Sequence, residues 1–344
     1  MSSGSGSGSL LKYIGIRVLL VIPMMWVLLT LVFILLRVAP GDPVTAAVGD
    51  KLSPAAIAQR QHQLGLDKPL IQQYVEYIGH VCRFDFGTTI TDKEPVLTVI
   101  RDQGGATLTL TLGAFLFAVA VGVPLGRLAG RRRDTALDAG IRVFGVVTYA
   151  APIFWVGIML VALVIKFLPS WPTFGIASPV VAFEVPTKTH IMLVDAVLYG
   201  HGDAITDVLK HHVLPCFTLG LLLMGVIIRL VRVNVIQAMK GDYVEAARAR
   251  GIKEGRVIRK HAFRNALVPV ITVIGLQVAL TLSGAVLTER TFNWPGLGTA
   301  LITYLNGRDY IAVQGLVTFF AIVVVIVSVL VDIINALVDP RVRY

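Results

Sequence analysis

The chain has 344 residues, of which 55% are hydrophobic and 15% are charged, and its mean hydropathy is +0.76. This composition excludes an ordinary soluble domain. Apolar runs long enough to cross a bilayer, which takes about 20 residues of helix, recur along the chain. We therefore expect an all-α integral membrane protein.

The N-terminal region divides into two parts. Residues 1–9 are rich in Gly and Ser and predict a flexible tail, which is either native or a linker added for expression. Residues 10–38 contain an apolar run that exceeds the roughly 7–15 residues of a signal-peptide core, and no small-residue cleavage site closes it. This segment predicts a retained first transmembrane helix.

Residues 39–102 predict an extracytoplasmic insert with two short helices. Ser53 and Pro54 supply an N-cap and a first-turn proline for a helix that ends near Gly65. Apolar residues then recur at helical spacing over 69–81. The insert is either a cap packed on the membrane spans or a platform for an external partner.

Residues 103–338 predict the membrane core, and residues 339–344 a short C-terminal tail. Pro152 lies within one predicted span and can kink it. The five predicted spans of the core are residues 103–126, 143–166, 213–233, 266–288 and 310–334.

The distribution of charge predicts the orientation. Six spans place both termini on one side, and the segments on that side hold 19 Lys and Arg against 7 Asp and Glu. The segments on the other side hold 12 and 14. By the positive-inside rule both termini are cytoplasmic. Because the basic charge follows this rule, membrane lipids are the expected contacts and nucleic acid is not an inferred partner.

A basic segment at 240–264 interrupts the apolar pattern. Residues 243–250 are good helix formers, Gly251 suits a helix C′ position that needs a positive φ, and residues 253–263 resume a helical pattern. The segment predicts a helix–Gly–helix hairpin that projects from the membrane. The alternative is a solvated loop that only sets the topology.

The sequence of this segment resembles that of a known protein family. Glu245-Ala246-Ala247, followed after three residues by Gly251, resembles the EAA loop of permease subunits of ABC importers. The run at 261–269, His-Ala-Phe-Arg-Asn-Ala-Leu-Val-Pro, is similar to the dipeptide/oligopeptide (peptide/nickel) branch, B type, and departs from the Ile-x-Leu-Pro ending of the wider family. Further short sequence motifs similar to those of this branch lie at 39–43, 64–67, 85–88 and 289–298.

The resemblance implies a type I ABC importer permease fold and a role in coupling. It assigns docking of an ATPase to the EAA loop, which we carry onto Glu245, Ala246, Ala247 and Gly251. It also implies a second homologous permease, two ATPase subunits or one fused ATPase, and an extracytoplasmic substrate-binding protein. The chain itself has no Gly-x-x-x-x-Gly-Lys-Ser/Thr phosphate loop. It is thus not expected to be an enzyme or to hold a cofactor, and ATP and Mg²⁺ would bind the partner subunits.

Polar and aromatic residues within the spans are candidates for lining a translocation pathway, although any one of them can equally be a packing residue. The candidates are Thr148, Tyr149, Phe154, Gln277, Thr281 and Ser283. No catalytic or metal-binding motif is expected, because the spacing of His190, His201, His211 and His212 matches no tight ligand set.

The resemblance implies a subunit that forms half of the translocation pathway of an ATP-driven importer of dipeptides and oligopeptides in the bacterial cytoplasmic membrane. Two alternatives remain open from the sequence. The first is the same architecture importing nickel or another small solute. The second is a membrane scaffold whose cytoplasmic hairpin docks a partner that is not an ATPase.

Overall fold

The computed structural model describes residues 6–38, 53–63, 65–257 and 284–338, together with residues 263, 266, 270, 277 and 281. In these residues the regular structure is helical, apart from one isolated β-bridge between Thr88 and Pro95. The all-α prediction is confirmed. The C-terminal tail predicted at 339–344 and the first part of the predicted insert, residues 39–52, lie outside the described residues.

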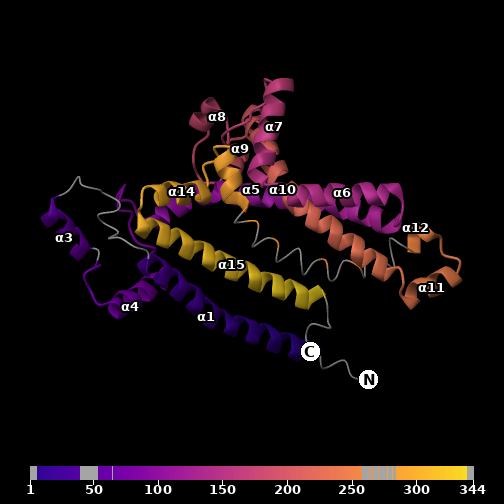
Figure 1. Cartoon of the computed structure of the whole chain (residues 1–344), viewed down its shortest axis with the longest axis horizontal. Coiled ribbons are helices and arrows are strands. Elements are labelled where there is room, and N and C mark those ends of the chain that lie inside the picture. The colour runs from indigo at the N-terminus through magenta and orange to yellow at the C-terminus, as the bar shows by residue number, and fades with distance from the viewer. Residues whose placement is uncertain are drawn as a thin grey trace.

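Among the described residues, four helices are long and apolar enough to cross a membrane: α1 (Gly6–Val38), α5 (Val96–Arg131), α10 (Gly202–Ala238) and α15 (Tyr310–Val338). Helices α1 and α15 lie side by side and antiparallel (Figure 1). Arg17 Nη1 joins them through an ion pair of 3.1 Å to Asp332 Oδ2. Helices α5 and α10 approach closely at Gly126 of α5. A Cβ at this position would lie only 2.7 Å from the Ile228 carbonyl oxygen of α10.

The predicted span at 143–166 is not one straight helix. Helix α6 (Ala136–Ala150) and helix α7 (Ile153–Phe167) meet at a bend of 105°. Ala151 precedes Pro152, and both residues adopt extended backbone angles, with ψ of 133° and 123°. A residue before proline is driven out of the helical region by the proline ring. With this pair counted as one span, the described residues contain five candidate spans.

The observed helices extend beyond the predicted boundaries. Helix α10 begins at Gly202 rather than near residue 213, and α1 begins at Gly6, inside the tail that we predicted to be flexible. Hydropathy marks only the apolar window, whereas helix propagation continues through polar flanking residues. Of the span predicted at 266–288, residues 284–288 form part of a helix over 284–291, and most of the remainder lies outside the described residues.

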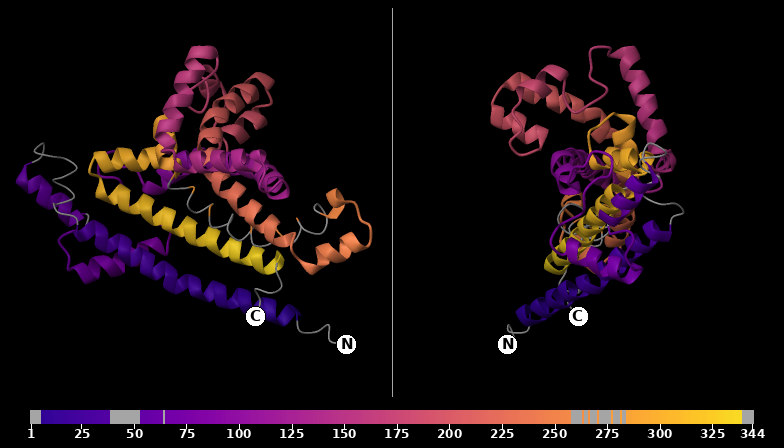
Figure 2. Two further views of the ribbon diagram at one scale, coloured as in Figure 1. Left: turned by 45° about the vertical axis from the view of Figure 1, so that its right-hand side comes forward. Right: turned by 90° about the vertical axis from the view of Figure 1, so that its left-hand side faces the viewer.

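The two ends of the molecule carry different short helices. Helices α3 (Pro54–Gln63) and α4 (Leu70–Val81) lie at one end, and α11 (Asp242–Ala249) and α12 (Glu254–Arg256) lie at the other (Figures 1 and 2). The start of α1 and the end of α15 lie at the same end as α11 (Figure 1). Helices α8 (Pro179–Glu184), α9 (Met192–Tyr199) and α14 (Leu297–Asn306) complete the fold.

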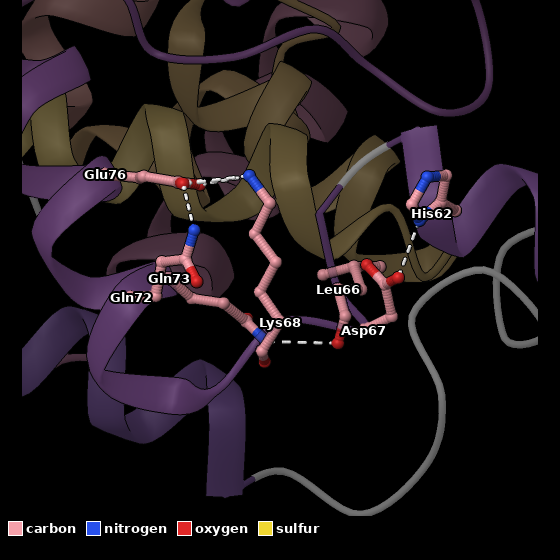
Figure 3. A network of polar contacts seen from close by, with 7 residues as sticks. All are labelled: His62, Leu66, Asp67, Lys68, Gln72, Gln73 and Glu76. Atoms are coloured by element: carbon pink, nitrogen blue, oxygen red, sulfur yellow. Dashed lines mark hydrogen bonds and ion pairs between the residues drawn. The ribbon is translucent and has the colours of Figure 1, made fainter.

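Polar contacts fix the turn between α3 and α4 (Figure 3). Lys68 Nζ donates hydrogen bonds of 2.8 and 2.9 Å to the two carboxylate oxygens of Glu76, and Gln72 Nε2 donates one of 3.1 Å. The hydrogen bond from Lys68 is the main cause that lowers the pKa of Glu76. On the other side of the turn, the His62 ring lies 2.7 Å from Asp67 Oδ2. These contacts hold α4 in a fixed direction relative to α3.

Candidate functional site

Helix α11 ends at a glycine in the left-handed region. Gly251 has a φ of +75°, and its N–H donates a hydrogen bond of 2.8 Å to the Arg248 carbonyl oxygen. The N–H of Ile252 donates one of 3.3 Å to the Ala247 carbonyl oxygen. This pair of bonds is the Schellman arrangement, with Gly251 at the C′ position. The predicted turn is confirmed.

A small apolar core holds the turn against the end of α10. Val244, Ala247 and Val257 are buried, and Met239 and Ile252 pack against them. Ala247 is only 4% exposed, so its side chain faces into the turn and away from any partner. Its small size allows the two short helices to approach closely.

The outward face of α11 carries the other residues of the motif. Glu245 and Ala246 are both exposed, and Tyr243 beside them is 40% exposed. Glu245 lies in the first turn of α11, where a carboxylate interacts favourably with the helix dipole. The structure thus divides the four predicted coupling residues: Glu245 and Ala246 are available to a partner, whereas Ala247 and Gly251 shape the turn.

The second helical piece of the hairpin is described only at its start. Helix α12 covers Glu254–Arg256, within the helical pattern predicted for residues 253–263. Most of that pattern after residue 257 lies outside the described residues. We define the coupling hairpin as residues 239–257, which include α11, the Gly251 turn and α12.

Three pathway candidates lie on either side of the bend between α6 and α7. Tyr149 and Phe154 are 60% and 47% exposed on the isolated chain. Thr148 is partly buried, and its hydroxyl donates a hydrogen bond of 3.1 Å to the carbonyl oxygen of Gly145. The bend therefore turns two aromatic side chains outward while the threonine bonds within its own helix.

The remaining pathway candidates belong to the fifth predicted span. Thr281 is 2% exposed, and its hydroxyl donates a hydrogen bond of 2.6 Å to the Gln277 carbonyl oxygen. Gln277 is partly buried, and Ser283 lies outside the described residues. Burial of Thr281 favours a packing role over direct contact with a transported molecule.

The four histidines have separate partners. His190 Nδ1 lies 3.0 Å from Asp102 Oδ1, and His201 Nδ1 lies 3.1 Å from the Tyr199 carbonyl oxygen. On α10, the Nδ1 atoms of His211 and His212 lie 2.8 and 2.7 Å from the carbonyl oxygens of the residues four positions earlier. Within the described ranges, no group of three or more His, Cys, Asp or Glu side chains is arranged to hold a metal ion.

A buried carboxylate that the sequence analysis missed ties the segment around α14 to α5. Glu289 is 0% exposed and follows the fifth predicted span. Its Oε1 accepts a hydrogen bond of 2.6 Å from Thr107 Oγ1, and its Oε2 accepts one of 2.9 Å from the Thr299 N–H. Burial raises the pKa of Glu289 to about 7, although these hydrogen bonds oppose the shift. The sequence signal that could have indicated this contact is the pair of glycines after Glu289, Gly296 and Gly298, because a side chain at either position would collide with the carboxylate.

Comparison with known proteins places the coupling hairpin in its context. Residues 122–344 match the family described as binding-protein-dependent transport system inner membrane component, and residues 10–111 match its N-terminal family. The chain belongs to this family. It is a multi-pass membrane permease. The family resemblance that the EAA-like motif indicated is confirmed.

Several relatives span almost the whole permease. The dipeptide transport system permease protein DppB of Escherichia coli (strain K12) is 40% identical over 97% of this chain and 99% of its own length. The di/tripeptide permease DppB of Pseudomonas aeruginosa (strain UCBPP-PA14) is 38% identical over 97% and 99%. The oligopeptide permease AppB of Bacillus subtilis (strain 168) is 33% identical over 96% and 99%.

A solved structure supports the fold. A chain of the MetNI methionine ABC transporter, in an inward-facing conformation, superposes with a TM-score of 0.52 at 14% identity. The match covers 68% of this permease and 93% of that chain. This likeness supports the type I ABC importer permease fold.

Proposed function

We propose that this permease forms half of the translocation pathway of an ATP-driven, binding-protein-dependent importer of dipeptides and oligopeptides. The observation that carries the proposal is the full-length similarity to permeases named for these substrates, with identities of 32–40% in the DppB and AppB relatives. The geometry of the coupling hairpin supports an attachment point for a separate ATPase. Nickel or another small solute is the alternative cargo.

The proposed assembly contains a second homologous permease, two ATPase subunits or one fused ATPase, and an extracytoplasmic substrate-binding protein. ATP and Mg²⁺ would bind in the ATPase subunits. Both termini and the coupling hairpin would face the cytoplasm, in line with the basic charge of those segments. Closure of the ATPases around ATP would displace the hairpin and move the spans between inward-open and outward-open states, a rigid-body type of transition.

The insert fits both roles that the sequence left open. Tyr77 Oη lies 2.7 Å from Thr318 Oγ1 of α15, so one face of α4 packs on a membrane span. Ile71 and Val75 point away from Tyr77 on α4 and are 79% and 64% accessible, and Leu70 at the start of the helix is 62% accessible. Exposed apolar residues grouped in this way are typical of interaction surfaces. We assign this face to contact with the substrate-binding protein.

Reversal of the charge at Glu245 tests the ATPase contact. We expect Glu245→Lys to weaken association of the ATPase by roughly tenfold or more, because a charge-assisted hydrogen bond contributes about 1.5–3 kcal/mol. Asp242→Lys is the matched control, since Asp242 lies in the same first turn and loses the same interaction with the helix dipole. Co-purification at graded salt measures the effect. Equal retention of the ATPase by Glu245→Lys and the unmodified permease would remove Glu245 from the contact.

Purification of the intact complex in mild detergent tests the function as a whole. We expect a second permease and ATPase subunits to co-purify, and peptide together with binding protein to raise ATP turnover. Stimulation by nickel in place of peptide would support the alternative cargo. Purification with partners that lack ATPase activity would support the scaffold and contradict the importer.

A further inference from the structure

An ion pair between a buried carboxylate and a partly exposed guanidinium joins α6 to α10 near the coupling hairpin. Asp138 is 0% exposed, and its two carboxylate oxygens accept hydrogen bonds of 2.6 and 2.8 Å from Nε and Nη2 of Arg232. This two-point arrangement of a guanidinium and a carboxylate fixes both distance and orientation. The two residues are 94 positions apart in the chain.

The same carboxylate also organises the start of α6. Asp138 Oδ2 accepts a hydrogen bond of 3.1 Å from the Asp134 N–H, and the Asp138 N–H donates one of 3.3 Å to Thr135 Oγ1. Thr135 is the N-cap of α6, so these reciprocal bonds resemble a capping box. Arg142 approaches more loosely, with Nε 3.7 Å from Asp138 Oδ2 and a side chain 53% exposed. Arg232 is therefore the principal partner, and it holds the capped end of α6.

Arg232 belongs to the part of α10 that leads directly into the hairpin. Helix α10 is continuous over 37 residues and ends at Ala238. Tyr243 Oη donates a hydrogen bond of 3.0 Å to the Ala238 carbonyl oxygen, and Met239 packs in the hairpin core. Because α10 is regular helix from Arg232 to Ala238, well beyond Pro215, displacement of the hairpin carries Arg232 with it.

At its other end, α6 leads to the bend at Pro152. Thr148 and Tyr149 lie just before the bend, close against Gly225 of α10, where a Cβ would meet Thr148 Oγ1 at 2.9 Å. Helix α6 thus contacts α10 at both ends, through the ion pair near the hairpin and through close packing near the bend. The ion pair holds the hairpin end of α6 in a fixed direction on α10, so a change in the hairpin can reach the bend along α6.

We propose that Asp138 and Arg232 are positioning residues that make α6 and the coupling hairpin move as one body, so that ATPase-driven motion reaches the bent span. The inference rests on the proposed coupling function. An apolar pair would tie the helices together with equal or greater stability. A bidentate ion pair adds a fixed relative orientation, which is what transmission of a small displacement requires.

Replacement of the pair by apolar side chains tests its role in coupling. In Asp138→Leu/Arg232→Met the packing volume is largely retained and the fixed orientation is lost. We expect assembly and basal ATP hydrolysis within twofold of the unmodified complex, and peptide transported per ATP reduced at least tenfold. Arg232→Gln alone keeps the Asp138 carboxylate at the start of α6 and should also lower the ratio, while Arg142→Gln should leave it unchanged. An unchanged ratio in the apolar variant would overturn the proposal.

A distance measurement tests the same inference without any substrate. Spin labels are placed at two exposed positions, Val147 of α6 and Lys240 of the hairpin, after Cys82→Ser and Cys216→Ala remove the native thiols. We expect the distance between the labels to stay constant when nucleotide is trapped in the assembled complex, and to change with nucleotide in the apolar variant. A distance that shifts with nucleotide in the unmodified pair, or stays constant in the apolar variant, would overturn the inference. If the distance stays constant in the unmodified complex but peptide fails to stimulate ATP hydrolysis in the purified complex, the result counts against the peptide function alone.

Discussion

Replacement of Gly251 by valine should abolish transport and weaken association of the ATPase, while the permease still inserts into the membrane. Gly251 has a φ of +75°. A β-branched residue is a genuine outlier there, with a strain of about 1–3 kcal/mol. Relief of that strain would break the hydrogen bonds of 2.8 and 3.3 Å that close α11. The outward face that carries Glu245 would then lose its fixed direction. Peptide uptake and ATPase co-purification from membranes measure the result.

Gly255 provides a matched control for this substitution. A Cβ added to either Gly251 or Gly255 would meet no atom of the described residues within 4 Å, so neither change causes a collision with them. Of these two glycines, only Gly251 has a positive φ. Gly255→Val should therefore retain most transport, and Gly251→Ala should fall between the two valine variants. Normal uptake by Gly251→Val would refute the turn as an element of coupling, whereas equal losses at both positions would point to loss of space.

The coupling hairpin could be predicted in outline because its signals are local. Helix formers over 243–250 and a glycine at 251 specify a helix and its end without reference to the rest of the fold. The division of Ala246 and Ala247 between an exposed and a buried face could not be predicted. That division depends on how Met239 and Val257 pack across the turn, and the two alanines are equivalent in composition.

The bent span shows a second limit of local signals. Pro152 predicts a break in the helix, and the extended backbone of Ala151 follows from its position before proline. The angle of 105° does not follow. It is set by packing of α6 along α10, where Gly145 and Gly225 lie close together.

The burial of Asp138 and of Glu289 could not be predicted from the sequence for a different reason. Asp138 was counted with the charges of a cytoplasmic loop, and its partner Arg232 lies 94 residues away. Glu289 and Thr107 are separated by 182 residues. No periodicity or local motif specifies pairs at such separations, so only the assembled fold brings them together.

Removal of the Glu289 carboxylate should destabilise the packing of the segment around α14 on α5. Without it, the Thr107 hydroxyl and the Thr299 N–H lose buried acceptors at 2.6 and 2.9 Å. Each unsatisfied buried group costs about 1–3 kcal/mol, so Glu289→Ala should lose about 2–6 kcal/mol of stability. The neighbouring glycines support this role, because a Cβ on Gly298 would lie 2.8 Å from Glu289 Oε2. Thermal unfolding of the purified complex measures the loss, and Thr303→Ala on the exposed face of α14 is the control.

The pH dependence of stability distinguishes the charge of Glu289 from its hydrogen bonds. Burial raises the pKa of this carboxyl from 4.5 to about 7. A raised pKa means that the folded state favours the protonated acid. The stabilising contribution is therefore complete below pH 4.5 and declines as the pH rises through about 7. Glu289→Gln is neutral at every pH and nearly the same shape. We expect its unfolding temperature relative to that of the unmodified permease to rise between pH 5 and pH 8. A difference that is constant over this range would mean that Glu289 is ionised throughout and acts only as an acceptor for the segment around α14.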